Sequence, residues 1–187
     1  MPGKIYIPEM FAEIVDNLNQ HINIGYTSKF SYGHYADVVK ELKQIDGAIN
    51  GYVKYPLIWL VMDYVEKTTE ALDEECELHN IQILIVCDTD ANYSMTERMN
   101  VSFKSKLYFI YKQLLKEIVH SGYFKQSVVS KLSFEKIDRP YWGGGGENGS
   151  NGAANLFSDY VDAIQIRNLS LNLKRIKTTN CSLKQIN

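Results

Sequence analysis

Hydrophobic residues recur at helical spacing near the start of the chain. Pro8 suits the first position of a helix, because that position needs no backbone N–H. Ser31 is the predicted cap of a second, short helix that ends before Gly47. The stripe of the first helix is Phe11, Ile14, Val15, Leu18 and Ile22, and that of the second is Tyr35, Val38, Val39, Leu42 and Ile45.

The longest helix is predicted from about Ser94 to His120. Ser94 and Glu97 match the capping-box pattern, in which each side chain bonds the other residue's backbone N–H. Gly122 can end the helix. Its expected buried residues are Phe103, Leu107, Ile110, Tyr111, Leu114, Leu115 and Ile118, and its exposed side carries Lys104, Lys106, Lys112, Lys116 and Glu117.

Four segments have the pattern of β-strands. KYPLIWLVMDYV and IQILIVCD are apolar at successive positions, which is typical of strands covered on both faces. SVVSKLSFEKID alternates, with Val128, Leu132 and Phe134 on one face. In YVDAIQIRNLSLNLK the apolar positions change from even to odd numbers, which predicts a β-bulge around Arg167–Asn168.

This order of elements predicts an α+β fold, an antiparallel sheet packed on the long helix and the N-terminal helices. Residues 1–174 form one predicted domain, with a Gly-rich hairpin loop at 142–154, and 175–187 form a basic C-terminal tail. The acidic stretch Glu66–Glu77 is expected to be an exposed loop or the arm of a hairpin. The predicted core is Phe11, Ile14, Leu18, Leu60, Ile83, Ile85, Leu107, Ile110, Leu114, Ile164 and Ile166.

Composition narrows the class of protein. The 187 residues carry a net charge of −2, whereas dedicated nucleic-acid binders usually have a basic excess. No apolar run is long enough to span a membrane. The three cysteines form no CxxC pair, which favours free thiols in a reducing compartment. Thirteen tyrosines suit a surface that is partly buried and partly wet, as interfaces are.

No segment predicts catalysis, a metal site or a cofactor. The run Gly143–Gly146 lacks the Lys-Ser or Lys-Thr that a phosphate-binding loop requires. Asp88 and Asp90 follow an apolar strand and are interpreted as turn formers rather than metal ligands or nucleophiles. Cys76 and His79 have a ligand-like spacing but no second ligand pair, and Cys87 is expected in the core.

Four segments in order resemble a known group of viral proteins. They are KYPLIWL, ILIVCDTDANYSMTERMNVSFKSKLYFIYKQLL, SFEKIDRPYWGG and YVDAIQIRNLSLNL. Their succession is similar to tail-completion or tail-terminator-like neck proteins of phages and prophages of Bacteroidota, including crAss-like phages. The resemblance implies a structural virion protein without enzymatic activity, which forms a ring at the neck or tail and is assembled in the host bacterial cytoplasm.

Charge and composition agree with a ring subunit. Between Asp63 and Glu77 there are seven acids and one Lys, whereas Ala163–Asn187 holds five basic residues and no acid. We expect contacts with other copies, with neck, tail or portal-associated proteins and with packaged DNA in the lumen, and none with a membrane. The predicted interface residues are Trp142, Gly143, Gly144, Gly145, Gly146, Arg175, Lys177, Glu70, Glu74 and Glu75. The alternative is a nucleic-acid-binding accessory protein that uses the Lys-rich helix face and the basic tail.

Overall fold

The structure is a computed structural model that describes residues 6–22, 25–34, 37, 40, 54–68, 76–142 and 159–174. The helices and turns are α1 (Ile7–His21), α3 (Met95–Arg98), η1 (Met99–Leu107), α4 (Tyr108–His120) and η2 (Val129–Lys131). The strands are β1 (Lys29–Gly33), β2 (Leu57–Val61), β3 (Val65–Thr68), β4 (Cys76–Asp88), β5 (Ser133–Arg139) and β6 (Val161–Asn172).

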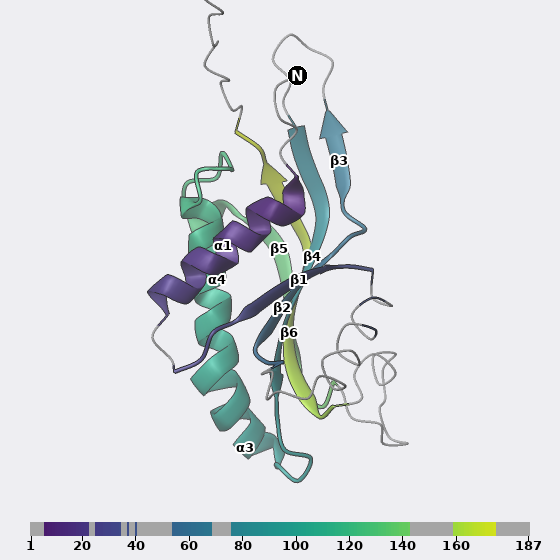
Figure 1. Cartoon of the computed structure of the whole chain (residues 1–187), viewed down its shortest axis with the longest axis vertical. Helices are drawn as coiled ribbons and strands as arrows, with labels where there is room; N and C mark the ends of the chain where they lie inside the picture. The colour runs from purple at the N-terminus through teal and green to yellow at the C-terminus, as the bar shows by residue number, and fades with distance from the viewer. Residues whose placement is uncertain are drawn as a thin grey trace, which may run out of the picture.

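A mixed, mostly antiparallel sheet forms one layer of the molecule. Its six strands have the order β1-β2-β4-β6-β5, with β3 also paired to β4. Only β1 and β2 run parallel among the pairs described. The helices α1 and α4 lie together on one face of this sheet (Figure 1). The predicted α+β class with a largely antiparallel sheet is therefore confirmed.

Three successive helical segments, α3, η1 and α4, occupy Met95–His120, where the sequence predicts one long helix. Ser94 and Glu97 form both hydrogen bonds of the capping box, and Gly122 has a φ of +82° just after the helix. The middle segment η1 is π-helical, which the sequence analysis did not predict. A spacing of four between Phe103 and Leu107 suits a helix of either kind, so periodicity alone could not distinguish them.

Three local predictions need correction: the helix cap at Ser31, the start of β5 and the exposure of Glu117. Ser31 does not cap a helix, because it lies in β1, where it pairs with Trp59 of β2. Its neighbour Phe30 points to the helix-covered face and packs against the buried cluster there. The stripe Tyr35–Ile45 lies outside the described residues. Residues 129–131 form a 3-10 turn, so β5 starts at Ser133 rather than before it.

Glu117 is buried, although the sequence predicts it on the exposed side of the long helix. The C-terminal end of α1 contacts α4 at this position, where the Glu117 carboxylate accepts a 2.9 Å hydrogen bond from His21 Nδ1. Gln113 on α4 also donates to Glu117. A carboxylate that two side chains contact in this way can be buried between helices, which the pattern of α4 alone does not reveal.

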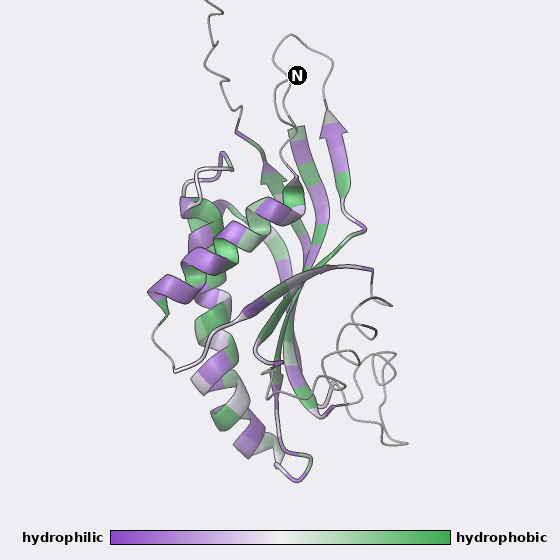
Figure 2. Ribbon diagram, in the orientation of Figure 1, coloured by the Kyte–Doolittle hydropathy of each residue, from purple (hydrophilic) through white to green (hydrophobic). Residues whose placement is uncertain are grey.

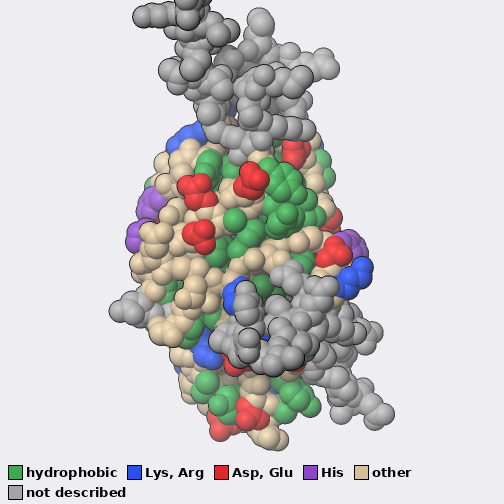
Figure 3. Space-filling view, in the orientation of Figure 1, with side chains coloured by type: hydrophobic (Ala, Val, Ile, Leu, Met, Phe, Trp, Pro, Cys, Tyr) green, Lys and Arg blue, Asp and Glu red, His purple; other side chains and the backbone are tan. Residues whose placement is uncertain are grey.

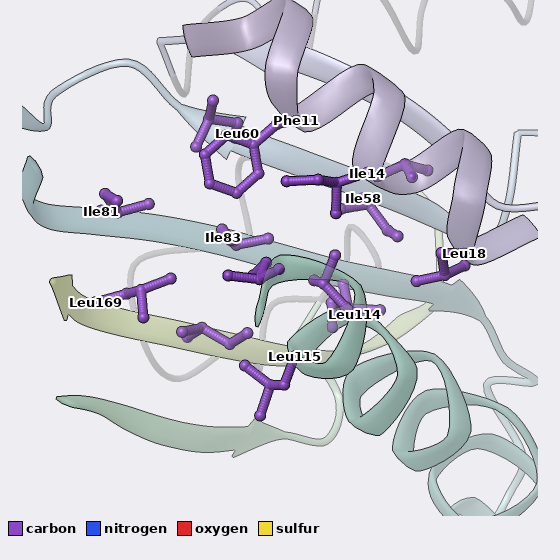
Figure 4. Packing of buried hydrophobic residues seen from close by; sticks show 14 of the residues in the cluster. Phe11, Ile14, Leu18, Ile58, Leu60, Ile81, Ile83, Leu114, Leu115 and Leu169 are labelled. Atoms are coloured by element: carbon purple, nitrogen blue, oxygen red, sulfur yellow. The ribbon is translucent and has the colours of Figure 1, made fainter. Parts of the chain in front are cut away.

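All eleven predicted core residues belong to one buried cluster between the sheet and the helices. Figure 4 shows Phe11, Ile14 and Leu18 of α1 facing Leu60 and Ile83 of the sheet, with Leu114 of α4 beside them. Along α1 and α4, hydrophobic and hydrophilic residues alternate around the helix axis, as helices with one buried face require (Figure 2).

A second, smaller cluster lies on the opposite face of the sheet. It comprises Tyr55, Leu57, Trp59, Val61, Leu84, Val86, Trp142, Val161 and Ala163. Because Ile58 and Leu60 belong to the first cluster, both faces of β2 are buried, as its uninterrupted apolar sequence predicts.

The change of parity in β6 is produced by the predicted β-bulge. Ile83 pairs with Ile166 and Ile81 pairs with Leu169, so one extra residue of β6 lies between these pairs. Asn168 adopts a left-handed φ of +54° there. A matching bulge on β4 at Asn80, with a φ of +58°, restores the register towards Leu78 and Leu171. The two opposed bulges keep both strands buried on the helix-covered face.

Replacement of Asn168 tests this backbone conformation. Asn168→Ala is expected to lower the free energy of unfolding by about 1 kcal/mol, because a Cβ without a compensating amide is strained in the left-handed region. Asn168→Gly is the matched control and should leave stability nearly unchanged. Urea denaturation measures both, and equal stability of the two variants would contradict a left-handed Asn168.

Candidate interaction surfaces

The predicted interface residues fall almost entirely on segments that the structure does not describe. Gly143, Gly144, Gly145, Gly146, Arg175, Lys177, Glu70, Glu74 and Glu75 lie outside the described residues, so their interface role stays a prediction. The arms of the hairpin expected around Glu66–Glu77 are described, since β3 pairs antiparallel with the start of β4.

Trp142 is described and belongs to the chain's own second cluster. Only 8% of it is exposed, and its backbone N–H donates to the Val161 carbonyl at 3.0 Å. The indole therefore anchors the start of the Gly-rich segment on the sheet. A role for this segment in an interface would rest on the residues after Trp142.

A buried arginine fixes the neighbouring backbone. Arg98 is 1% exposed, and its Nη1 donates to Asp162 Oδ1 at 2.9 Å. Its other nitrogens donate to the carbonyls of Tyr93 and Asp90 at 3.2 and 2.8 Å. The Tyr141 ring stacks on the guanidinium, with its centroid 3.6 Å from Cζ. Arg98 thereby joins the β4–α3 turn to the ends of β5 and β6.

Asp90 forms a turn after β4, as the sequence predicts, whereas Asp88 is the last residue of β4 and pairs with Val161 of β6. The backbone N–H of Asn92 donates to Asp90 Oδ1 at 2.8 Å, which is an Asx turn. Asp88 has an exposed side chain whose Oδ1 lies 3.4 Å from Lys106 Nζ.

The cysteine and histidine positions do not assemble a metal site among the described residues. Cys87 is fully buried in the first cluster, and burial raises the pKa of its thiol to about 12. Cys76 packs against that cluster, whereas His79 contacts Ser170 of β6 on the other face of the sheet. The ligand-like spacing of Cys76 and His79 therefore separates them across the sheet.

His79 lies between a carboxylate and a hydroxyl group. Its Nε2 is 3.0 Å from Glu77 Oε2, and its Nδ1 is 3.4 Å from Ser170 Oγ. His79 therefore connects Glu77 of its own strand β4 to Ser170 of the neighbouring strand β6.

An aromatic patch lies beyond the N-terminal end of α1, on the helix-covered side of the sheet. We define it as Tyr6, Phe30, Tyr32, Met62 and Tyr64. The Tyr6 and Tyr32 rings meet edge to face with centroids 6.0 Å apart, and Phe30 stacks on Tyr32 at 6.3 Å. Tyr6 and Tyr32 are each 44% exposed and Met62 is 38% exposed. Tyr6, Tyr32 and Met62 are thus the exposed members of the patch, whereas Phe30 and Tyr64 are half-buried and pack against the first cluster.

Acidic residues border the aromatic patch. Glu9 on α1 and Glu66 on β3 are both exposed, and both act on the patch tyrosines through their negative charge. A hydrogen bond with Tyr32 raises the pKa of Tyr6, and burial raises that of Tyr64 to about 12. Figure 3 shows hydrophobic side chains gathered in the upper half of this face, with Asp and Glu side chains beside them. The patch is apolar and neutral at its centre and negative at its border.

A basic stripe runs along the outer face of the long helix. We define it as Phe109, Lys112 and Lys116 of α4, all of which are exposed. The spacings of three and four residues place them on one side of the helix. Phe109 is 55% exposed, the highest value among the described large hydrophobic residues. The basic stripe lies on α4, whereas the aromatic patch comes from the residue before α1, from β1 and from the segment between β2 and β3. In Figure 1, α4 lies on the left and β3, which follows Tyr64, lies on the upper right.

Comparisons with known proteins assign no family. No protein-family model matches the sequence, and no curated protein is significantly similar to it. None of the described helices is long and apolar enough to cross a membrane.

Proposed function

We propose that this protein is a structural subunit, without catalytic activity, that assembles with copies of itself into a closed ring at the neck or tail of a phage particle. The observation that carries the proposal is the pair of different exposed surfaces. One is aromatic with acidic residues at its border, and the other is basic with an exposed phenylalanine. A head-to-tail ring needs two unlike surfaces that complement each other, whereas a two-fold dimer needs one surface that complements itself.

The viral assignment depends on the resemblance of the segment order to neck and tail-completion proteins. The α+β fold, with helices on one face of a mostly antiparallel sheet, is compatible with it. In such a particle the ring would contact neck, tail or portal-associated proteins, and DNA would pass through its lumen. Repeated copies supply avidity, so each contact between subunits can be weak.

Assembly of the purified chain tests the proposal. Light scattering and native mass spectrometry should detect an oligomer with a defined number of subunits, and negative-stain images should show rings. Antibodies against the chain should label the neck or tail of particles that contain it. A chain that stays monomeric at every concentration, or labelling absent from particles, would contradict the proposed function.

The exposed lysines also support a second candidate, a nucleic-acid-binding accessory protein. Lys104, Lys112 and Lys116 are exposed along one helix, and such side chains can neutralise backbone phosphates. Retention on DNA that falls steeply with salt, by a chain that remains monomeric, would favour this candidate over the ring.

A further inference from the structure

We infer that the aromatic patch of one copy receives the basic stripe of the next copy, with Phe109 placed against Tyr6 and Tyr32. This inference rests on the proposed ring and names its contact. Both surfaces contain an apolar centre and charged neighbours, but the charges have opposite signs. A second copy of this chain therefore supplies an exposed aromatic ring, Phe109, and two positive charges, Lys112 and Lys116, to the aromatic patch.

The apolar part of the contact follows from exposure. Tyr6 and Tyr32 leave 44% of their surface to solvent, and Phe109 leaves 55%. Exposed clusters of large aromatic residues mark interaction sites more often than single exposed side chains do. Aromatic rings pair favourably at edge-to-face or offset geometry, and the Tyr6–Tyr32 pair already presents one face and one edge.

The charged part of the contact fixes its direction. Glu9 and Glu66 border the patch, and Lys112 and Lys116 follow Phe109 by one and two helical turns. The ammonium groups can meet these carboxylates or lie over the neutral tyrosine rings as cation–π pairs. The chain already uses such pairs internally, since Lys136 Nζ lies 4.6 Å from the Tyr108 ring centroid.

Two copies of the basic stripe would repel each other, and so would two acidic borders. The charge pattern thus disfavours a symmetric dimer through either surface and favours a head-to-tail contact. An apolar patch without charged neighbours would have no such preference for the surface of its partner.

Cross-linking between two differently tagged chains tests the contact. One chain carries Tyr32→Cys, and the other carries Phe109→Cys. After mild oxidation, we expect a disulfide-linked pair that contains both tags. The matched control replaces Phe109→Cys by Val128→Cys, which is 44% exposed outside both surfaces. Each single variant alone controls for the native thiols, and thermal melting checks that each variant is folded.

The outcomes separate this inference from the proposed function. Rings that form without cross-linking above the control would overturn the docking contact and leave the ring standing. Strong cross-linking of Tyr32→Cys or Phe109→Cys with itself would overturn the head-to-tail direction. Absence of any oligomer would overturn both proposals.

Charge exchange gives an independent measurement. Lys112→Glu is expected to weaken self-association by about tenfold, because it places like charges at the contact. Glu9→Lys in the same chain should restore most of the affinity, since the exchanged pair is again opposite in sign. Lys131→Glu, an exposed residue outside both surfaces, is the control and should have little effect. A loss of DNA retention by Lys112→Glu with unchanged self-association would overturn the inference and support the second candidate function.

Discussion

Replacement of Arg98 by methionine is expected to lower the free energy of unfolding by about 3–5 kcal/mol. Asp162 is 0% exposed, and among the described residues Arg98 and the Tyr141 backbone N–H donate to its Oδ1. No hydrogen-bond partner of its Oδ2 is found in the described part of the chain. Without the guanidinium, a carboxylate would stay buried with one donor, and the Asp90 and Tyr93 carbonyls would each lose one of their donors.

A second variant distinguishes charge burial from simple loss of packing. In Arg98→Met with Asp162→Leu, no uncompensated charge remains, so most of the lost stability should return. Arg98→Lys should recover little, because one ammonium group cannot reach the separate acceptors that the planar guanidinium spans. Urea denaturation monitored by circular dichroism measures all three. A cost below about 1 kcal/mol for Arg98→Met would show that this ion pair is dispensable.

Truncation of Leu114 to alanine should lower the free energy of unfolding by about 2–5 kcal/mol. Leu114 is 0% exposed and lies in the cluster between α4 and the sheet (Figure 4). The change removes buried apolar surface and leaves a cavity that surrounding strands and helices fill only in part. The midpoint of urea unfolding should fall while the slope of the transition stays the same.

Phe109→Ala is the matched control on the same helix. Because Phe109 is 55% exposed, its truncation should change stability by no more than about 0.5 kcal/mol. The two variants therefore separate the core from the proposed contact, since Phe109→Ala should weaken assembly without unfolding the chain. Equal destabilisation by both would mean that the inner and outer faces of α4 are misassigned.

Much of the fold could be predicted because local patterns report which face of an element is buried. The stripe from Phe11 to Leu18 located α1, and Ser94 with Glu97 located the start of the long helix. The switch of parity between Ile166 and Leu169 predicted the bulge in β6. In each case the informative residues are neighbours in the sequence, and the backbone geometry relates them directly.

The candidate surfaces were less predictable. The tyrosine content and the Lys side of the long helix are visible in the sequence, but the interface predicted from it lies at the Gly-rich loop, the acidic insert and the tail. Tyr6 precedes a helix, Tyr32 lies in a strand, and Tyr64 follows another strand. Only pairing of β1 with β2, and packing of α1 on them, brings these rings together.

By itself, the sequence determined the buried stripe of α1, the capping box at Ser94, the bulge in β6 and the residues of the main core. The tertiary structure alone decided that Arg98 and Glu117 are buried, and that Tyr6 and Tyr32 share a surface. The physical reason is the range of the interactions. Periodicity is set by each element's own geometry, whereas burial of a charge depends on a partner such as Asp162, 64 residues away along the chain.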